Sequence, residues 1–151
     1  MGMSDNQAVI RRMFEDVINE GRLELVDVLF DPAFTSETPQ GILDRDAFRQ
    51  YVKDWRAGFS DVHCHVGDFV EEGDSIAWSV RAKGTHDGEF MGIPATGRTV
   101  EFDSLNIAVM RNGRGYRHKV VMDTGAMLAQ LGLVPDQGRG EQQGQGQGQE
   151  A

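Results

Sequence analysis

The sequence predicts one α+β domain in which helices pack on one face of a curved antiparallel sheet. Apolar residues recur at helical spacing up to residue 58 and alternate at strand spacing after residue 60. Helical spacing returns after residue 123. Helices that precede a strand meander are typical of the α+β class. A chain of 151 residues, 39% of them hydrophobic, is long enough to bury one sizeable core.

The first helix is predicted up to Ile18, with Ser4 or Asp5 as its N-cap and Gly21 as its end. Its apolar stripe follows the spacing that places side chains on one helix face. The residues of this stripe are Val9, Ile10, Met13, Phe14, Val17 and Ile18.

Two further helical segments are predicted before any strand. The second is short, covers residues 25–30 and is ended by Asp31-Pro32, because proline cannot continue a helix. The third begins after Asp44, a favourable N-cap residue, and ends near residue 58. Its apolar face consists of Ala47, Phe48, Tyr51, Val52 and Trp55.

The sheet is predicted from a change of period. Apolar and polar residues alternate over residues 62–66 and again over residues 76–80, as in half-buried strands. The segment Glu72-Gly73-Asp74 is a tight connection between these two strands. Strands joined in this way run antiparallel.

A second hairpin and a final helix complete the expected order. Asn112-Gly113 favours a tight hairpin between strands over residues 100–110 and 116–122. A last helix is predicted over Thr124–Leu131, stopped by Gly132. The folded domain is expected to cover residues 4–135.

Residues 136–151 are predicted to be a disordered Gln/Gly tail, because they have almost no residue that could build a core.

Composition excludes several functions. The chain has 15 basic and 24 acidic residues, a formal charge of −9, which argues against nucleic acid as a partner. No apolar run approaches the roughly 20 residues that span a bilayer, and the start does not resemble a secretory signal. One cysteine, Cys64, excludes an internal disulfide. We therefore expect a cytoplasmic protein with no membrane partner.

No metal site is expected. His63 and His65 could supply two imidazoles, but the sequence identifies no third ligand. Cys64 alternates with Val62 and Val66 and is interpreted as a core residue. Phosphate-binding loops and nucleophile elbows are absent as well, so any chemistry must use scattered acids and bases.

Two residues near the end of the domain are candidates for chemistry. Asp123 lies where a strand gives way to the last helix, so it either points into the concavity of the sheet or caps that helix. His118 lies five residues earlier on the same strand, which places the two on opposite faces unless the strand bulges. A surface histidine is the alternative interpretation of His118.

The segment from Gly84 to Gly97, GTHDGEFMGIPATG, resembles the GTHxGxFxGxPxTG signature of the SnoaL-like polyketide cyclase, or ester cyclase, family. The similarity continues through Asn112-Gly113-Arg114 to His118, Asp123 and the ending of the family. It extends over nearly everything from residue 8 to residue 135.

The resemblance implies the cone-shaped α+β barrel of nuclear transport factor 2 and ketosteroid isomerase, with a pocket between helices and sheet. It also implies an intramolecular aldol cyclisation of a hydrophobic carbonyl compound without metal or organic cofactor. The general acid/base of the family would be Asp123, and His118 would position the substrate or stabilise the enolate. A homodimer is expected on the same ground.

The sequence departs from the family pattern near this pocket. Glu37 stands where the family often has a histidine, Lys119 where it has tryptophan, and Asn106 where a charged residue is common. Glu37 is either a second acid/base or a solvated loop residue. Asn106 could orient a carbonyl but could not exchange a proton.

Three further residues are candidate contacts of the substrate. Trp55 and Trp78 could form walls of the pocket or belong to the core. His86 belongs to the signature, whose glycines and proline are equally consistent with a structural turn. Three functions therefore remain open: a cyclase-like enzyme or a related hydroxylase or isomerase, a small-molecule-binding module, and a dimerising interaction domain.

Overall fold

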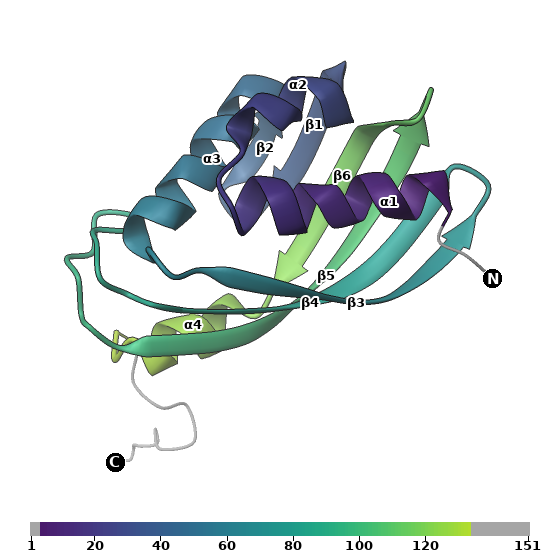
Figure 1. Cartoon of the computed structure of the whole chain (residues 1–151). Coiled ribbons are helices and arrows are strands. Elements are labelled where there is room, and N and C mark those ends of the chain that lie inside the picture. The colour runs from purple at the N-terminus through teal and green to yellow at the C-terminus, as the bar shows by residue number, and fades with distance from the viewer. Residues whose placement is uncertain (1–3, 134–151) are drawn as a thin grey trace.

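The computed structural model describes residues 4–133 and has the predicted α+β architecture (Figure 1). The proposed tail, residues 136–151, and the domain boundary at residue 135 lie outside the described residues. The helices are α1 (Asp5–Arg12), η1 (Met13–Ile18), η2 (Leu23–Leu25), α2 (Val26–Leu29), α3 (Arg45–Gly58) and α4 (Thr124–Gln130). The strands are β1 (Phe30–Thr38), β2 (Gly41–Asp44), β3 (His63–Glu72), β4 (Ser75–Thr85), β5 (Thr99–Arg111) and β6 (Arg114–Met122).

The first helix begins as predicted but changes its winding. The Ser4 side chain accepts a hydrogen bond of 3.1 Å from the Gln7 N–H and so caps α1. After Arg12 the chain continues as the π-helix η1, in which the Asn19 N–H bonds to the Phe14 carbonyl. The wider π turn places Met13, Phe14 and Val17 in the core.

The third predicted helix is confirmed as α3. Asp44 accepts a hydrogen bond of 2.8 Å from the Ala47 N–H, as expected of its N-cap. Phe48 and Val52 are buried on the face of α3 that meets the sheet. The strand periods and both predicted turns are confirmed as well, and Asn112 and Gly113 both have positive φ angles, as a tight hairpin turn requires.

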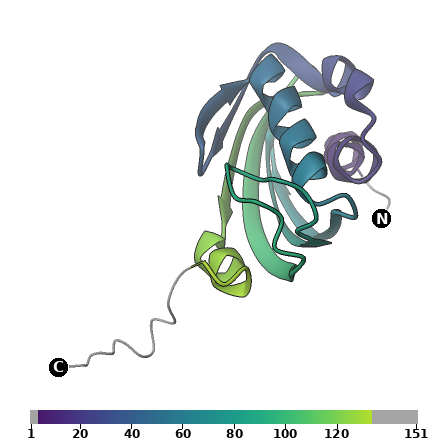
Figure 2. The ribbon, with the colours of Figure 1, turned by 90° about the vertical axis from the view of Figure 1, so that its left-hand side faces the viewer.

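The six strands form one curved sheet in the order β2-β1-β6-β5-β4-β3. Figure 2 shows this sheet bending around α1 and α3, which lie in its concavity, while α4 lies beyond its end. The resemblance to a cone-shaped barrel is confirmed in this curvature, although the sheet stays open with β2 and β3 as its edges. Every pairing is antiparallel except β1 with β6, which is parallel, so the expected antiparallel sheet is a mixed one.

The β1–β2 hairpin was not predicted. Residue 30, expected in a helix, begins β1, and the segment around Glu37, expected in a loop, lies in the same strand. Pro32 falls within β1 at a register shift between Phe30 and Thr35, and this irregularity hides the strand period.

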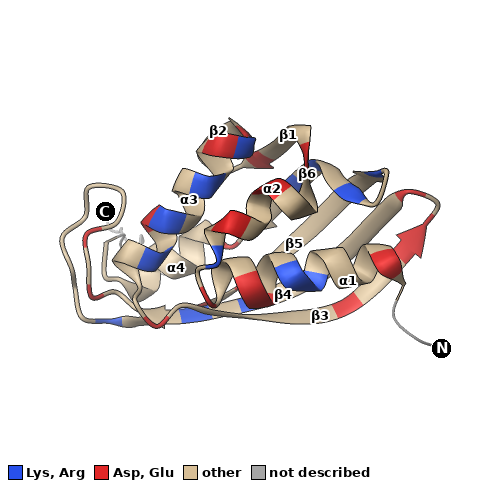
Figure 3. Ribbon diagram, turned by 45° about the horizontal axis from the view of Figure 1, so that its top comes forward, with Lys and Arg blue, Asp and Glu red and all other residues tan. Residues whose placement is uncertain are grey.

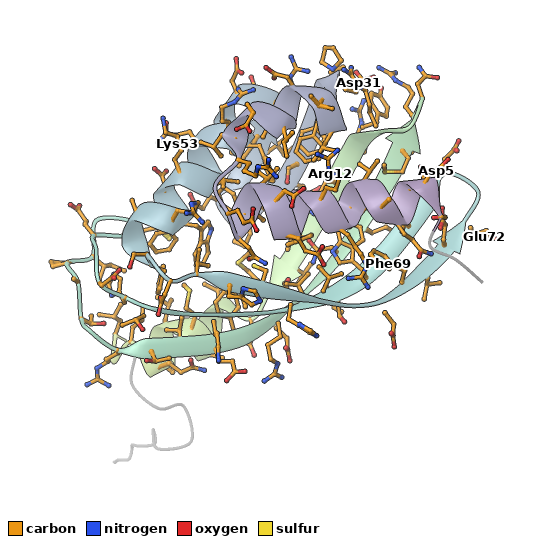
Figure 4. All side chains as sticks on the ribbon, viewed as in Figure 1. Asp5, Arg12, Asp31, Lys53, Phe69 and Glu72 are labelled. Atoms are coloured by element: carbon orange, nitrogen blue, oxygen red, sulfur yellow. The ribbon has the colours of Figure 1, made fainter. Side chains whose placement is uncertain are left out.

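The core lies between the helices and the concave face of the sheet. Aromatic rings of β1 and α3 pack there: Phe30 stacks on Phe34 with ring centroids 4.3 Å apart, and both contact Phe48 edge-on. Phe69 of β3 packs against the same core beneath α1 (Figure 4).

The edge of the sheet at β3 is tied to the first helical segment. The side-chain amide of Asn19 accepts a hydrogen bond from the Cys64 N–H at 2.7 Å and donates one to the Cys64 carbonyl at 2.9 Å. At the other end of β3, Glu71 accepts a hydrogen bond of 2.7 Å from the Ser4 hydroxyl.

Charged residues of both signs occur along α1 and α3 (Figure 3). Among the described residues, no helix is long and apolar enough to cross a membrane.

Candidate functional site

A cavity lies between the helices and the concave face of the sheet, with a free volume of about 70 Å³. The π-helix η1 contributes Phe14, and α3 contributes Tyr51 and Trp55. The inner sides of β3 to β6 form the opposite wall, and most of the lining is apolar. The alternation of the strands explains this wall, because every second residue of β5 is buried and His118 and Val120 are buried in the second half of β6.

A chain of hydrogen bonds occupies the β5–β6 wall of the cavity. His118 Nε2 lies 2.9 Å from Asn106 Oδ1, and Asn106 Nδ2 donates to the Ser104 hydroxyl at 3.2 Å. Behind the ring, the Ser36 hydroxyl lies 2.7 Å from His118 Nδ1. With the Asn106 oxygen facing the ring, His118 carries its proton on Nε2 and accepts a hydrogen bond from Ser36 on Nδ1.

His118 is held as a neutral imidazole. Its exposed fraction is 7%, and the Trp78 ring stacks on it with centroids 5.8 Å apart. Burial lowers the pKa of His118 to about 4, because the imidazolium loses its hydration there, and none of the described residues that line the cavity is a carboxylate that could stabilise it. At neutral pH the ring therefore offers one N–H donor and one lone pair.

The described residues that line the cavity include no acidic or basic side chain besides His118. The other titratable groups are Tyr51 and Cys64. Burial raises the pKa of the Tyr51 phenol and raises the pKa of the Cys64 thiol to about 12. Both therefore stay protonated, and the cavity suits an apolar ligand that accepts hydrogen bonds.

Asp123 does not line this cavity. Its side chain is exposed and accepts a hydrogen bond of 3.1 Å from the Ala126 N–H, so that it is the N-cap of α4. A spacing of five residues places two side chains on opposite faces of a regular strand. The structure agrees, because His118 points into the cavity and Asp123 is exposed outside it. The structure thus does not bring these two residues together.

The other predicted contacts divide into two groups. Asn106 and Trp55 line the cavity, whereas Trp78 does not line it and is buried behind His118. Glu37 is half exposed on the outer side of the sheet, where its Oε2 forms an ion pair with Lys119 Nζ at 3.6 Å.

His86 lies outside the cavity lining as well. It is fully buried, accepts a hydrogen bond of 3.2 Å from the Thr96 N–H, and stacks on Phe59 with centroids 5.2 Å apart. Its contacts are those of a residue that holds the signature segment in place.

Two serines of the site were not predicted. Ser104 could have been found, because it lies two residues before Asn106 on an alternating strand and so shares its face. Ser36 has no such signal, because its strand, β1, was not predicted.

The signature segment packs against the helical wall of the cavity. Phe90 contacts Trp55, a lining residue, with ring centroids 4.4 Å apart. Asp87 anchors the segment through hydrogen bonds from the Ser60 N–H, at 3.0 Å, and from the Ser60 hydroxyl. Gly88 is required at this contact, because a Cβ there would lie 2.1 Å from the Ala57 carbonyl oxygen.

Comparison with known proteins identifies this arrangement. The family described as SnoaL-like polyketide cyclase matches residues 8–131. IdmH of Streptomyces antibioticus, named as a candidate polyketide cyclase, is 33% identical, with a TM-score of 0.76 over 85% of this chain and 99% of its own. No curated protein matches the sequence significantly.

Two more distant structures show the same fold. A protein from a Jannaschia species, named as a candidate SnoaL-like polyketide cyclase, has a TM-score of 0.80 at 19% identity, over 89% of this chain and 99% of its own. AclR of Streptomyces galilaeus, named as a candidate hydroxylase, has a TM-score of 0.78 at 22% identity, over 89% of each chain.

Proposed function

Because the chain belongs to the SnoaL-like polyketide cyclase family, we propose that it binds a hydrophobic carbonyl compound in the cavity and cyclises it by an intramolecular aldol reaction. The observation that carries this proposal is the buried, neutral His118 in the β5–β6 wall of an otherwise apolar cavity. The reaction balances without a co-reactant. A base removes a proton next to one carbonyl, the resulting carbon attacks a second carbonyl, and the new alkoxide takes a proton.

His118 acts on the carbonyl oxygen. A ligand carbonyl that replaces Asn106 as the acceptor of the Nε2–H would be polarised by a neutral imidazole, which stabilises the enolate. Ser36 keeps the opposite nitrogen in its acceptor role. The Ser104 hydroxyl, already accepting from Asn106, has its own proton to give to the ligand.

The base that removes the carbon-bound proton is assigned to Asp123 on the family resemblance. Asp123 is the neighbour of Met122, which lines the cavity, and is therefore close to a bound ligand. Its carboxylate caps α4, however, and has to leave this cap to reach the ligand. Asp123→Asn tests this assignment cleanly, because asparagine caps a helix as well as aspartate does but does not accept the proton.

The experiment follows enolisation, the first step of the reaction. The probe is 2-acetylnaphthalene in deuterated water, and mass spectrometry measures deuterium incorporation into its methyl group. We expect the wild type to accelerate exchange, and His118→Gln and Asp123→Asn each to lower the acceleration by about 100-fold or more. His65→Gln, at an exposed position, is the matched control and keeps the wild-type rate. A chelator leaves the rate unchanged if the reaction needs no metal.

If His118→Gln exchanges deuterium as fast as the wild type, the catalytic role of His118 is refuted. An unchanged rate in Asp123→Asn alone would leave that residue as a helix cap. One observation favours a small-molecule-binding module as a second candidate function: among the described residues, no carboxylate lines the cavity. Binding of the probe without any accelerated exchange would identify a small-molecule-binding module.

A homodimer is proposed through the outer face of the sheet. Leu105, Ile107 and Val121 are 67%, 49% and 61% exposed there, and β5–β6 pairing places Leu105 beside Val121. Light scattering should give the mass of two chains for the wild type and of one chain for Leu105→Glu. Val28→Glu is the control, because Val28 is an exposed apolar residue of α2, away from this face. A wild-type monomer would refute the proposal.

A further inference from the structure

The helical wall of the cavity carries the hydroxyl of Tyr51 and the indole N–H of Trp55, both on α3. Its ring lies between Phe48 and Trp55, with centroid distances of 6.0 Å and 6.3 Å. Phe48 also contacts His118, at 6.3 Å between centroids. Phe48 therefore contacts both Tyr51 and His118, and the cavity has hydrogen-bonding groups on its helical wall and on its β5–β6 wall.

The proton of the Tyr51 phenol has no acceptor among the described residues. His118, Asn106 and Ser104 are joined in one chain of hydrogen bonds that does not include it. The neighbouring Trp55 side chain cannot accept this proton, because an indole N–H can only donate. The Tyr51 O–H is thus left to donate to something else.

The phenol keeps this proton at neutral pH. Burial in the cavity wall raises the pKa of Tyr51, and the neighbouring Trp55 side chain offsets only part of that increase. A partly buried donor without an acceptor is unfavourable unless a ligand or water supplies one.

We propose that Tyr51 determines ligand specificity by donating a hydrogen bond to a second oxygen of the ligand, across the apolar part of the cavity from His118. This rests on the proposed binding of a carbonyl compound in the cavity. The ligand class it names is an apolar, ring-sized body that carries two acceptor oxygens, one near His118 and one near Tyr51.

The test compares two probes of the same apolar body, 2-acetylnaphthalene with one carbonyl and 2,6-diacetylnaphthalene with two. Affinities are measured by quenching of tryptophan fluorescence. We expect the wild type to bind the diacetyl compound about 10-fold more tightly, the value of one buried hydrogen bond. Tyr51→Phe keeps the ring and should reduce this ratio to about one, while leaving the affinity for the monoacetyl compound unchanged.

Tyr116→Phe is the matched control. Tyr116 is the only other tyrosine, and its ring lies between the guanidinium groups of Arg111 and Arg117, at 3.7 Å and 3.9 Å. The control should keep the wild-type ratio. An equal loss of both affinities in Tyr51→Phe would show a structural role, and an unchanged ratio would show no role, so either result overturns the proposal.

The result also separates this proposal from the proposed function. If the wild type binds the monoacetyl compound but gains nothing from the second carbonyl, the role of Tyr51 is refuted and the proposed function stands. If neither compound binds, the proposed function fails and this inference fails with it.

A spectroscopic measurement covers the case in which Tyr51→Phe does not fold. Incorporation of 3-fluorotyrosine gives two ¹⁹F signals, and Tyr116→Phe assigns the one from Tyr51. The diacetyl compound should move the Tyr51 signal more than the monoacetyl compound does. Equal movements would contradict a hydrogen bond from Tyr51.

Discussion

The hydroxyl of Ser36 lies 2.7 Å from Nδ1 of His118, although 82 residues separate them in the chain. They are directly opposite in the parallel pairing of β1 with β6, the one parallel pair of the described sheet. Ser36 has no exposed surface. The strand that brings it there therefore both completes the sheet and fixes which nitrogen of the imidazole can donate.

Loss of this hydroxyl should destabilise the fold. Ser36→Ala leaves a buried ring nitrogen without its donor, which should lower the free energy of unfolding by about 1 to 3 kcal/mol. Urea denaturation measures this change. Ser75→Ala, at an exposed position of β4, should have almost no effect. Equal stability of both variants would show that the Ser36 hydrogen bond contributes nothing.

His118 should make stability fall as the pH decreases. The folded pKa of about 4 lies below the ordinary value of 6.5, so the unfolded chain binds the proton first. Above pH 6.5 both states are neutral and His118 has no effect. Between 6.5 and 4 the unfolded state gains stability, up to about 3 kcal/mol.

The difference between the wild type and His118→Gln isolates this effect. Carboxylates such as Asp31, whose pKa is lowered by its hydrogen bond with Arg111, lose stability in acid equally in both proteins. Urea denaturation at several pH values should therefore show a steeper decline for the wild type. Parallel curves would mean that His118 is not buried as a neutral ring.

The helix cap at Asp123 should be worth about 1 kcal/mol. Asp123→Ala removes the acceptor of the Ala126 N–H and should lower the unfolding free energy by that amount. Asp123→Asn should keep the wild-type stability, since asparagine also caps helices well. If alanine is as stable as asparagine, the side chain spends its time elsewhere, as a catalytic base near the cavity would.

Gly88 should be intolerant of a side chain. Gly88→Ala places a Cβ 2.1 Å from the Ala57 carbonyl oxygen, so the signature segment must move away from α3. We expect a loss of about 2 to 4 kcal/mol in thermal or urea unfolding. Gly125→Ala is the control, because its nearest neighbour lies at 3.9 Å and α4 tolerates alanine. A stable Gly88→Ala protein would show that the segment adapts freely.

Phe90 should control entry to the cavity. The free volume of about 70 Å³ is far below the roughly 300 Å³ that ring-sized ligands need, so the wall at Trp55 has to move for a ligand to enter. Phe90→Leu removes the ring that rests on Trp55 and should speed association of 2-acetylnaphthalene, followed by stopped-flow fluorescence. Met91→Leu, at an exposed neighbouring position, is the control. Equal association rates would place the entrance elsewhere.

The elements that could be predicted are those with local signals. The Asp44 cap of α3 and the Asn112-Gly113 hairpin each depend on a few adjacent residues, and both are present. The alternation of β5 correctly indicates which residues face the cavity. Residues 84–97 resemble the family signature and predict membership of the SnoaL-like polyketide cyclase family, which the family comparison confirms over residues 8–131.

The remaining features depend on partners that are distant in the sequence. β1 pairs with β6 across most of the chain and contains Pro32, so neither its period nor its neighbours identify it locally. Ser36 was missed for the same reason. The direction of Asp123 was left open by the sequence, because a residue between a strand and a helix can either cap the helix or point into the sheet.

The Asn19 amide has a consequence for the solution behaviour of the chain. β3 is an edge strand, and unpaired edge groups are where strands of different molecules join into aggregates. By pairing with both the N–H and the carbonyl of Cys64, the side chain of Asn19 imitates the backbone of a neighbouring strand. Asn19, at the C-terminal end of η1, thus protects that part of the edge strand from pairing with another molecule, and a single side chain does what an additional strand would otherwise do.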